Sequence, residues 1–266
     1  MAKAPSLLGP GDPAPVVLLR EEGRSPFFLV CDHAGRAFPG RLKRLGLGEE
    51  ESLRHIAWDI GIEPVARLLS QRLDAALVLQ AYSRLVIDCN RDPKVESSIP
   101  ELSETTLIPG NRGLDQEARA DRIEAIFRPY HNAIAAALER RKVRGQTSVL
   151  IALHSFTPNF KGVARRWHAG VLYNRDSRLA HPFLLRLRSE QGLVVGDNEP
   201  YRVSDETDYT VPVHGERGGL PHVEIEIRQD LLTEPEGQRL WAERLARLLP
   251  QAYEDLFGAL PGAPLF

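Results

Sequence analysis

Phe27-Phe-Leu-Val30 and Val149-Leu-Ile-Ala-Leu153 are continuous apolar runs. Such runs are typical of β-strands that are covered on both faces. Segments with the periodicity of amphipathic helices lie between the apolar runs of this chain. Strands that alternate with helices predict an α/β layer fold with a mostly parallel central sheet and helices on both faces. Ligands of such sheets gather at the carboxyl ends of the strands, so a functional site is expected there.

The remaining elements are expected from the same two patterns. Two segments outside the expected helices and strands, 91–112 and 196–220, are long and polar. Such loops inside a compact domain are usually functional or mobile. Strands are expected at 26–32, 75–80, 85–90, 148–153, 169–174, 193–195 and 222–228, and helices at 60–73, at 116–141 with a kink at Pro129, at 182–191 and at 237–257.

The size and composition of the chain suit one domain. The 266 residues are 42% hydrophobic and 26% charged, which is enough to bury a large core. We therefore expect a single α/β domain over residues 1–266, with an ordered core at about 14–258 and frayed tails rich in Ala, Pro and Gly.

Charge and cysteine content narrow the possible partners. A net charge of −2 and a pI near 6.5 give no bulk attraction for nucleic acid or an anionic membrane surface, so a small molecule or peptide is the expected partner. Cys31 and Cys89 lie in apolar runs and are expected to be buried free thiols in a reducing compartment. The chain has no long apolar leader and no stretch of about 20 apolar residues, which predicts a soluble, cytoplasmic protein. The oligomeric state stays open.

The segment His222-Val-Glu-Ile-Glu-Ile-Arg228 alternates polar and apolar residues. Because strand side chains alternate between faces, Glu224 and Glu226 share one face and lie about 7 Å apart. Unpaired carboxylates are costly to bury, so a cation, a bound metal or water is expected at this face.

A histidine stands at the end of each of two apolar strands. His33 follows the strand expected at 26–32, and His154 follows the one expected at 148–153. In a parallel sheet both ends lie on the same edge, where two imidazoles could begin a zinc site with ligands at about 2.0–2.2 Å and an open position for water. The alternative for each histidine is an ordinary core or surface residue.

A third ligand is expected to be a carboxylate. Asp59 offers one in the segment Ala57-Trp-Asp-Ile-Gly61. The alternative is that Asp59 caps the helix expected at 60–73, a role that an Asp at this position fills for about 1 kcal/mol.

Hydrogen-bond donors flank one of the expected strands. Arg84 precedes this strand, and Asn90 and Arg91 close it. A guanidinium is suited to bidentate binding of a carboxylate or to stabilising an oxyanion. The alternative is a structural ion pair of either arginine with Asp88 or Asp92.

Two further segments carry donors, residues 164–168 and His214-Gly-Glu-Arg217-Gly-Gly219. The second lacks the strand and helix context of a dinucleotide-binding glycine loop, so we interpret it as a flexible loop on the substrate side with Arg217 as a candidate substrate ligand. Serine and cysteine nucleophiles lack support, because no Gly-x-Ser-x-Gly elbow occurs and both cysteines lie in strands. Three other histidines are expected at the surface, namely His55, His131 and His181.

Several short segments form a specific combination. They are Cys31-Asp-His-Ala-Gly35, Trp58-Asp-Ile-Gly61, Ser83-Arg-Leu-Val-Ile-Asp88, Asn90-Arg-Asp-Pro93, His154-Ser-Phe-Thr-Pro158 and Gly218-Gly-Leu-Pro-His-Val-Glu-Ile-Glu-Ile-Arg228. Together, over about residues 26–232, they resemble the N-formylglutamate amidohydrolase family. That family is similar to the zinc carboxypeptidases and aspartoacylases, which implies a mixed, eight-stranded, zinc-carboxypeptidase-like sheet between helices.

The resemblance implies roles for individual residues. His154-Ser-Phe is similar to the second zinc-histidine segment of carboxypeptidases. Asn90-Arg91 is similar to their pair of residues that binds the substrate carboxylate. Arg84 is similar to their oxyanion arginine, and Glu226-Ile-Arg to the segment that holds their general-base glutamate.

One departure concerns the first metal-binding motif. Carboxypeptidases have His-x-x-Glu, whereas the third residue after His33 is Arg36. Asp59 is therefore the expected substitute for the missing glutamate, with Asp32 as the next candidate.

The resulting hypothesis is a zinc-dependent amidohydrolase that acts on linear amides. The resemblance implies hydrolysis of an N-formyl or N-acyl amino acid, such as N-formylglutamate, to formate and the free amino acid, within amino acid metabolism such as histidine degradation. His33, Asp59 and His154 would hold zinc, although such a site also accepts manganese, iron or cobalt. The other assigned roles are general base for Glu226 with Glu224 as second choice, oxyanion stabilisation for Arg84, and substrate binding for Asn90, Arg91 and Arg217.

Three alternatives remain at this point. A carboxypeptidase-like enzyme or another N-acyl amino acid hydrolase could use the same site with a different pocket. A non-catalytic module could bind carboxylates through its arginines without a metal. A buried structural network of polar residues would make Glu226→Gln destabilising.

Overall fold

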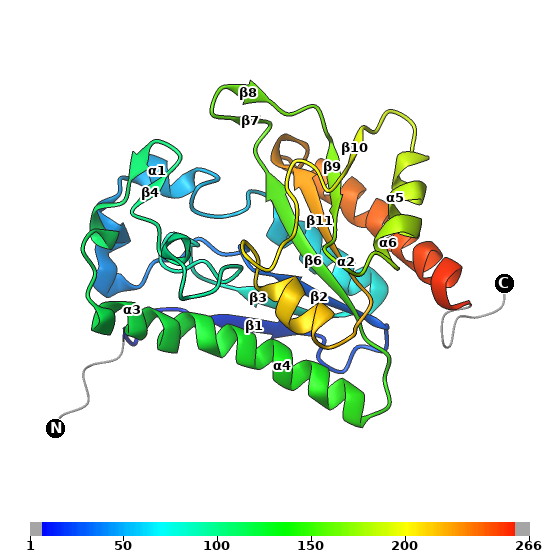
Figure 1. Ribbon diagram of the computed structural model, residues 1–266, viewed down its shortest axis with the longest axis horizontal. Helices are drawn as coiled ribbons and strands as arrows, with labels where there is room; N and C mark the ends of the chain where they lie inside the picture. The colour runs from blue at the N-terminus through cyan, green and yellow to red at the C-terminus, as the bar shows by residue number, and fades with distance from the viewer. Residues whose placement is uncertain (1–6, 259–266) are drawn as a thin grey trace.

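The structure is a computed structural model that describes residues 7–258. Figure 1 shows a central sheet with helices on both of its sides. The terminal segments 1–6 and 259–266, where frayed tails were expected, lie outside the described residues. Within the described range, none of the helices is both long and apolar enough to cross a membrane. Cys31 and Cys89 are buried and free, as expected.

In the described part of the chain, seven strands form the main sheet. In pairing order they are β1 (Val16–Leu19), β3 (Ala76–Gln80), β2 (Phe27–Cys31), β6 (Val149–Phe156), β11 (His222–Arg228), β9 (Ala169–Leu172) and β10 (Val195–Asp197). The four neighbours β3, β2, β6 and β11 run parallel to one another. β1 pairs antiparallel with β3, β9 pairs antiparallel with β11, and β10 is parallel to β9. The sheet is therefore mixed and mostly parallel.

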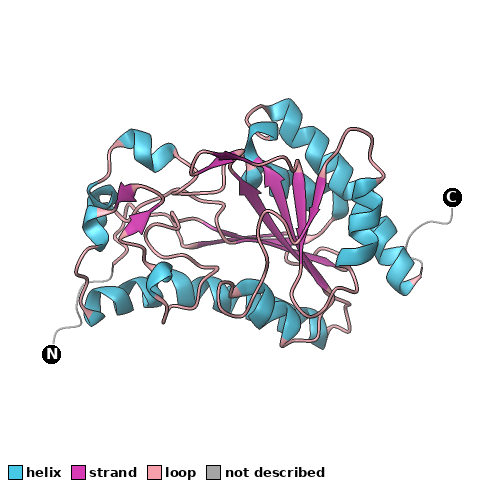
Figure 2. Ribbon diagram, turned by 45° about the horizontal axis from the view of Figure 1, so that its top comes forward, coloured by secondary structure: helices cyan, strands magenta, loops and turns pink. Residues whose placement is uncertain are grey.

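Helices cover both faces of this sheet. They are α1 (Glu49–Leu53), α2 (Ile62–Leu73), α3 (Gln116–Arg122), α4 (Arg128–Val143), α5 (Ala180–Arg188) and α6 (Pro235–Phe257). One apolar core joins α2, α5 and α6 to Phe27 and Leu29 of β2, and the second joins α4 to Phe28 and Val30. Figure 2 shows these helical layers on opposite sides of the strands. Both faces of β2 are thus buried, which explains its continuous apolar run.

Short elements fill the connections. Two small hairpins are β4 (Leu102–Ser103) with β5 (Thr106–Leu107), and β7 (Asn159–Phe160) with β8 (Val163–Ala164). The remaining turns are the 3₁₀ helices η1 (Gly40–Gly46), η2 (Glu96–Ser98), η3 (Pro109–Asn111) and η6 (Gln229–Leu231), and the π-helical turns η4 (Ile123–Phe127) and η5 (Val211–Glu216). Both long polar segments therefore contain local structure.

Five expected strands are confirmed, and β11 has the expected bounds. The strand expected at 193–195 begins instead at Val195. The sequence patterns missed β1, whose residues are half-buried at the edge of the sheet. The resemblance implied eight strands, whereas the main sheet of the described residues has seven.

The strand expected at 85–90 is wrong. These residues form successive turns, in which the backbone N–H of Val86 donates to Ser83 and that of Arg91 donates to Asp88. The apolar side chains of this segment are nonetheless buried in the core that α4 covers. The apolar run thus indicated burial correctly, but it carried no information about strand pairing.

The helix expected at 116–141 is divided by the π-helical turn η4, which ends just before Pro129. Pro129 lacks a backbone N–H, so the carbonyl of Ala125, four residues earlier, loses its usual donor. A π-turn is a common way to accommodate such a break. The disruption expected at Pro129 therefore takes the form of a π-turn.

Gly35→Ala should destabilise the fold. A Cβ at Gly35 would lie 2.0 Å from the backbone oxygen of Ala81, so either the end of β2 or the segment after β3 must move. We expect the free energy of unfolding in a urea titration to fall by about 1–3 kcal/mol, as in overpacked cores. In the matched control Gly40→Ala, the nearest atom is an Asp12 carboxylate oxygen at 3.6 Å, and the change should stay within about 0.5 kcal/mol. Equal stability of the two variants would contradict the close approach at Gly35.

Candidate active site

The two histidines singled out in the sequence meet at the carboxyl ends of β2 and β6. His33 lies two residues beyond β2, and His154 lies inside β6, which is longer than expected. β2 and β6 are parallel neighbours, and the ring centroids of the two histidines are 5.0 Å apart. Both side chains are buried. The structure therefore brings both imidazoles to one edge of the sheet, as expected.

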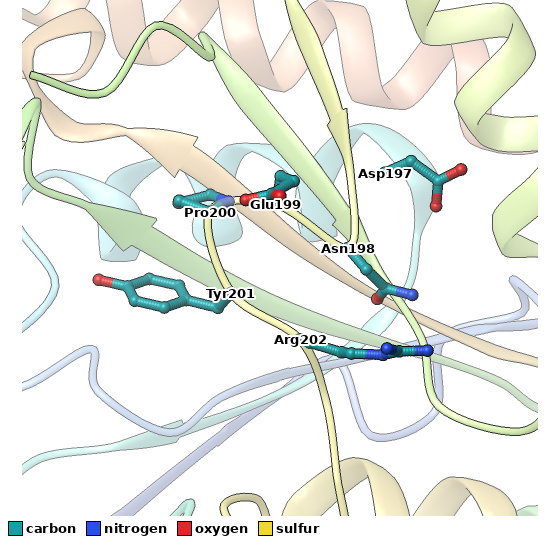
Figure 3. Close-up of a pocket in the computed structure, with 6 residues that line it drawn as sticks. All are labelled: Asp197, Asn198, Glu199, Pro200, Tyr201 and Arg202. Carbon is teal, nitrogen blue, oxygen red and sulfur yellow. The ribbon is translucent and has the colours of Figure 1, made fainter.

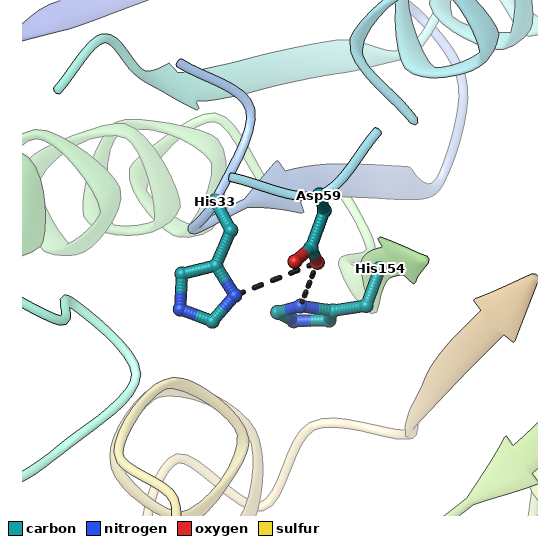
Figure 4. Close-up of side chains that lie close together, drawn as sticks. All are labelled: His33, Asp59 and His154. Carbon is teal, nitrogen blue, oxygen red and sulfur yellow. Dashed lines mark hydrogen bonds and ion pairs between the residues drawn. The ribbon is translucent and has the colours of Figure 1, made fainter. Parts of the chain in front are cut away.

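Asp59 lies between the two imidazoles (Figure 4). Its Oδ2 atom is 3.0 Å from Nδ1 of His154 and 3.5 Å from Nδ1 of His33, and it accepts a hydrogen bond of 3.2 Å from the backbone N–H of Ser155. The backbone N–H of Asp59 donates to the carbonyl of His33 at 3.0 Å, which fixes this loop against the end of β2. The alternative role of Asp59 as a helix cap is wrong, because α2 begins at Ile62 with Gly61 as its N-cap.

A carboxylate faces the outer nitrogen of each histidine, and the one beside His33 is hydrogen-bonded to it. Nε2 of His33 lies 2.7 Å from Oδ1 of Asp88. Nε2 of His154 lies 3.4 Å from Oδ2 of Asp32, whose other oxygen accepts from the Thr210 hydroxyl. Metal-binding histidines commonly donate their outer N–H to a carboxylate in this way.

The donor set His33, Asp59 and His154 fits a divalent metal ion. Tetrahedral ligands bound at about 2.0–2.2 Å lie about 3.3–3.6 Å from one another, and the two distances from Asp59 to the Nδ1 atoms are 3.0 and 3.5 Å. All three side chains are buried, and Nδ1 of His33 has no hydrogen-bond partner in the described part of the chain. Two nitrogens and one oxygen suit zinc and several other divalent ions.

Arg84 is tied to two of these carboxylates. Its Nε and Nη2 atoms donate to Oδ2 of Asp88 at 3.1 and 2.6 Å, and its Nη1 atom lies 3.5 Å from Oδ1 of Asp59. Burial opposes the ionisation of Asp88, but Arg84 and His33 outweigh it and hold the pKa of Asp88 well below its ordinary value. The alternative of an ion pair with Asp88 is therefore confirmed, while Arg84 also lines the cavity described below.

Glu224 and Glu226 are buried on one face of β11, and Glu226 is paired in register with His154 of β6. The Oε2 atom of each glutamate has no hydrogen-bond partner in the described part of the chain. Burial raises the pKa of both carboxyl groups to about 8, although His154 acts in the opposite direction. A carboxyl group with a pKa near the operating pH is suited to general acid–base chemistry.

Asn90 and Arg91 converge on one carboxylate oxygen. The side-chain amide of Asn90 and Nη1 of Arg91 both lie 3.2 Å from Oδ1 of Asp208. The backbone N–H groups of Tyr209 and Thr210 donate to Oδ1 of Asn90 and so fix the orientation of its amide. This pair of donors can therefore hold a carboxylate, and at present that carboxylate belongs to the protein itself.

One cavity of about 470 Å³ joins these groups. Arg217 is not among its lining residues but follows the π-turn η5. Arg36, which replaces the glutamate of the carboxypeptidase motif, stacks on Trp58 at 5.3 Å. The predicted site residues that line the cavity are His33, Asp59, Arg84, Asn90, Arg91, His154, Glu224 and Glu226.

His131, expected at the surface, is buried beside the site. Its Nε2 atom lies 2.8 Å from the carbonyl oxygen of Cys89, which can only accept, so Nε2 carries the proton. Its Nδ1 atom then accepts from Nε2 of His214 at 2.9 Å. Burial lowers the pKa of His131 to about 4 and that of His214 to about 3. The two residues are 83 positions apart, and no sequence spacing indicates their contact.

The N-formylglutamate amidohydrolase family model matches residues 25–233 of this chain. A curated N-formylglutamate deformylase from Pseudomonas putida is 30% identical over 149 residues, which cover 52% of this chain and 55% of the relative. The crystal structure of gene product Atu2144 from Agrobacterium tumefaciens is 36% identical, covers 94% of this chain and 98% of its own, and has a TM-score of 0.91. An N-formylglutamate amidohydrolase from Ralstonia eutropha JMP134 is 20% identical, covers 91% and 98%, and shares the fold with a TM-score of 0.66.

Because His131 and His214 are buried as a neutral pair, the free energy of unfolding should decrease as the pH is lowered. An unfolded histidine has a pKa near 6.5, whereas the folded values are about 4 and about 3. Below pH about 6.5 the unfolded chain binds protons that the folded chain excludes, so the free energy of unfolding decreases from pH 7 towards pH 4. His131→Gln keeps a donor for Cys89 and an acceptor for His214, and it should reduce this slope by up to about 1.4 kcal/mol per pH unit.

Chemical denaturation at pH 7, 6 and 5 measures this slope. The exposed His181 supplies the control, and His181→Gln should keep the slope of the wild type. Identical slopes in the wild type and both variants would show that His131 does not stay neutral in the folded protein.

Proposed function

The chain belongs to the N-formylglutamate amidohydrolase family, and from this premise we propose that it is a metal-dependent hydrolase of N-formyl amino acids, N-formylglutamate among them. Formate and the free amino acid would be the products, as part of amino acid breakdown such as that of histidine. The observation that carries the proposal is the buried set of His33, Asp59 and His154, which lines one cavity together with Glu226, whose Oε2 atom has no hydrogen-bond partner among the described residues. The similarity to the deformylase of Pseudomonas putida supports the choice of substrate.

His33, Asp59 and His154 would hold the metal ion, with zinc as the expected metal. When bound there, a divalent ion polarises the acyl carbonyl and brings the pKa of a water close to neutral. The protein helps to orient its ligands, because Asp88 bonds to the outer nitrogen of His33 and Asp32 lies 3.4 Å from that of His154.

Glu226 is the proposed general base. It accepts a proton from the attacking water while the water oxygen forms a bond to the acyl carbon. It then returns that proton to the amide nitrogen as the carbon–nitrogen bond breaks. The absence of any described hydrogen-bond partner on its Oε2 atom leaves this oxygen available for both transfers.

Arg84 is the proposed partner of the acyl oxygen as this oxygen becomes negative. Three of its five N–H groups are directed at Asp88 and Asp59, the side chain lines the cavity, and the remaining two are proposed to bind the acyl oxygen. Its ion pair with Asp88 fixes the guanidinium plane before the substrate arrives, which favours electrostatic stabilisation.

Asn90 and Arg91 are proposed to bind the carboxylate of the amino acid. They already converge on Oδ1 of Asp208, so a substrate carboxylate could replace that oxygen once Asp208 moves aside. Arg217 stays a prediction as a substrate ligand, because it lies outside the cavity lining and would need a shift of the segment after η5.

Metal removal should abolish hydrolysis. We expect about one equivalent of a divalent metal in chelator-free protein by elemental analysis, and loss of this metal in the folded variants His33→Ala and His154→Ala. Formate release from N-formylglutamate should fall to background after chelation and return on reloading with zinc. Asp88→Asn should weaken metal affinity by about 10–100-fold, because it loosens the orientation of His33.

Clean protein that cannot be loaded with any divalent metal would contradict this proposal. Unchanged binding of N-acyl amino acids after chelation would point to the carboxylate-binding module instead. Parallel assays with N-acetyl amino acids and C-terminal dipeptides distinguish the other hydrolase alternatives.

Glu226→Gln should lower kcat by about 10²–10⁴-fold, because the base is lost while the shape is kept. Metal content and the thermal midpoint should match the wild type. Glu224→Gln is the matched control on the same face of β11 and should keep kcat within about tenfold of the wild type. The reverse pattern would assign the base to Glu224, and a large loss of folded protein in Glu226→Gln would support a structural network.

A further inference from the structure

Tyr201 lies on the segment that follows β10 and has no role in the mechanism above. This segment, residues 197–202, lines an open hollow of about 540 Å³. Figure 3 shows that Tyr201 and Arg202 extend in opposite directions from its backbone. Tyr201 also lines the active-site cavity, together with Arg84 and Glu226. An aromatic residue therefore reaches the cavity from the long polar segment 196–220.

Arg165 holds Tyr201 in place. The guanidinium of Arg165 lies 4.6 Å from the ring centre of Tyr201 and 4.7 Å from that of Phe160. Its Nη1 atom donates to the Tyr201 hydroxyl at 2.7 Å. The backbone N–H of Arg165 donates to the carbonyl of Pro158, which anchors the β7–β8 hairpin. The stacking and the hydrogen bond together fix the position of the Tyr201 ring.

The hydrogen bond from Arg165 also determines what the Tyr201 hydroxyl can do. A guanidinium only donates, so the phenolic oxygen is the acceptor and its own proton must point elsewhere. Within residues 7–258, no acceptor for this proton is found. Burial raises the pKa of Tyr201, and the nearby Glu226 adds to this effect, so the hydroxyl keeps its proton at neutral pH. Tyr201 is 40% exposed, so this proton is available to solvent or to a ligand in the cavity.

A second donor at the acyl oxygen would complement Arg84. The charge of Arg84 is already shared between Asp88 and Asp59, which reduces its effect on a developing oxyanion. Oxyanion sites typically combine preorganised donors, each of which contributes to the rate.

We propose that Tyr201 donates a hydrogen bond to the acyl oxygen of the substrate as this oxygen gains negative charge, and that Arg165 is the residue that positions Tyr201. The phenol keeps its proton throughout, so the step adds no proton transfer to the mechanism. This inference rests on the proposed hydrolase function. It assigns Arg165, in the donor-rich segment 164–168, a role that the family resemblance did not supply.

Tyr201→Phe removes only the hydroxyl and keeps the stacked ring. In the metal-loaded enzyme, kcat for formate release should fall by about 10²–10³-fold with KM within a few-fold of the wild type. Tyr173→Phe is the matched control, because its hydroxyl bonds to Asp197 at 2.9 Å, outside the active-site cavity, and kcat should not change. Metal content and thermal midpoint should be the same in both variants.

The positioning role of Arg165 is tested by non-additivity. Arg165→Met should lower kcat in the wild-type background but by less than about twofold in the Tyr201→Phe background, because the two residues act as a unit. Arg165→Lys, which can still donate to the hydroxyl, should recover part of the loss. Arg166→Met is the control, since Arg166 stacks on Trp167 instead, at 5.6 Å. Additive losses in the double variant would show that Arg165 does not act through Tyr201.

A binding measurement separates this role from a structural one. The methylphosphonamidate of glutamate carries a tetrahedral oxyanion, whereas the product glutamate has no acyl oxygen. Tyr201→Phe should weaken inhibition by the phosphonamidate about 100-fold and leave inhibition by glutamate within about twofold. If the wild type is active and Tyr201→Phe keeps its kcat, or if both inhibitors are weakened equally, the role of Tyr201 is overturned while the proposed hydrolase function stands. Wild-type protein that hydrolyses no N-formyl or N-acyl amino acid would overturn the proposed function as well.

Discussion

Carboxyl groups crowd the interior of the site in excess of the positive charges that face them. Ionised carboxylates are costly to bury without partners. Among the described residues, Arg84 is the one arginine that forms ion pairs with the buried carboxylates of the site. Either protons or a cation must compensate for the rest. Burial raises the pKa of Glu224 and Glu226 to about 8, and a divalent ion beside them would lower the cost of ionising them. The buried carboxyl groups are Asp32, Asp59, Asp88, Glu224 and Glu226.

The parallel order of β2, β6 and β11 explains how groups far apart in sequence reach one place. The three strands run side by side, so their carboxyl ends deliver His33, His154 and Glu226 to one edge. The apolar residues of β11 face the core that α6 covers, which leaves the two glutamates on the opposite face. The alternation of side chains along β11 thus places apolar residues against the core and the two glutamates on the side of the cavity. One strand of seven residues therefore contributes to both the core and the candidate site.

The sequence was most informative where one physical rule acted alone. Alternation gave β11 its bounds, and continuous apolar runs located β2 and β6. It was misleading where burial is achieved without sheet pairing, because segment 85–90 buries its apolar side chains within turns. The sequence did not predict the burial of His131, because this residue of α4 contacts His214 of η5, far along the chain, and such a contact leaves no local pattern.

The position of Asp59 shows why spacing is a poor guide to the metal ligand that we propose. In the carboxypeptidase motif that the resemblance implied, the second ligand follows the first by three residues, whereas here Arg36 follows His33 by three residues and stacks on Trp58. The proposed metal site requires a carboxylate near the two Nδ1 atoms, but the chain can supply it from any segment that is held there. A backbone hydrogen bond from Asp59 to His33 ties its loop to the end of β2, and the carboxylate then reaches both imidazoles. The constraint on this site is therefore a position in space, and a ligand from a different segment can satisfy it when the backbone is anchored.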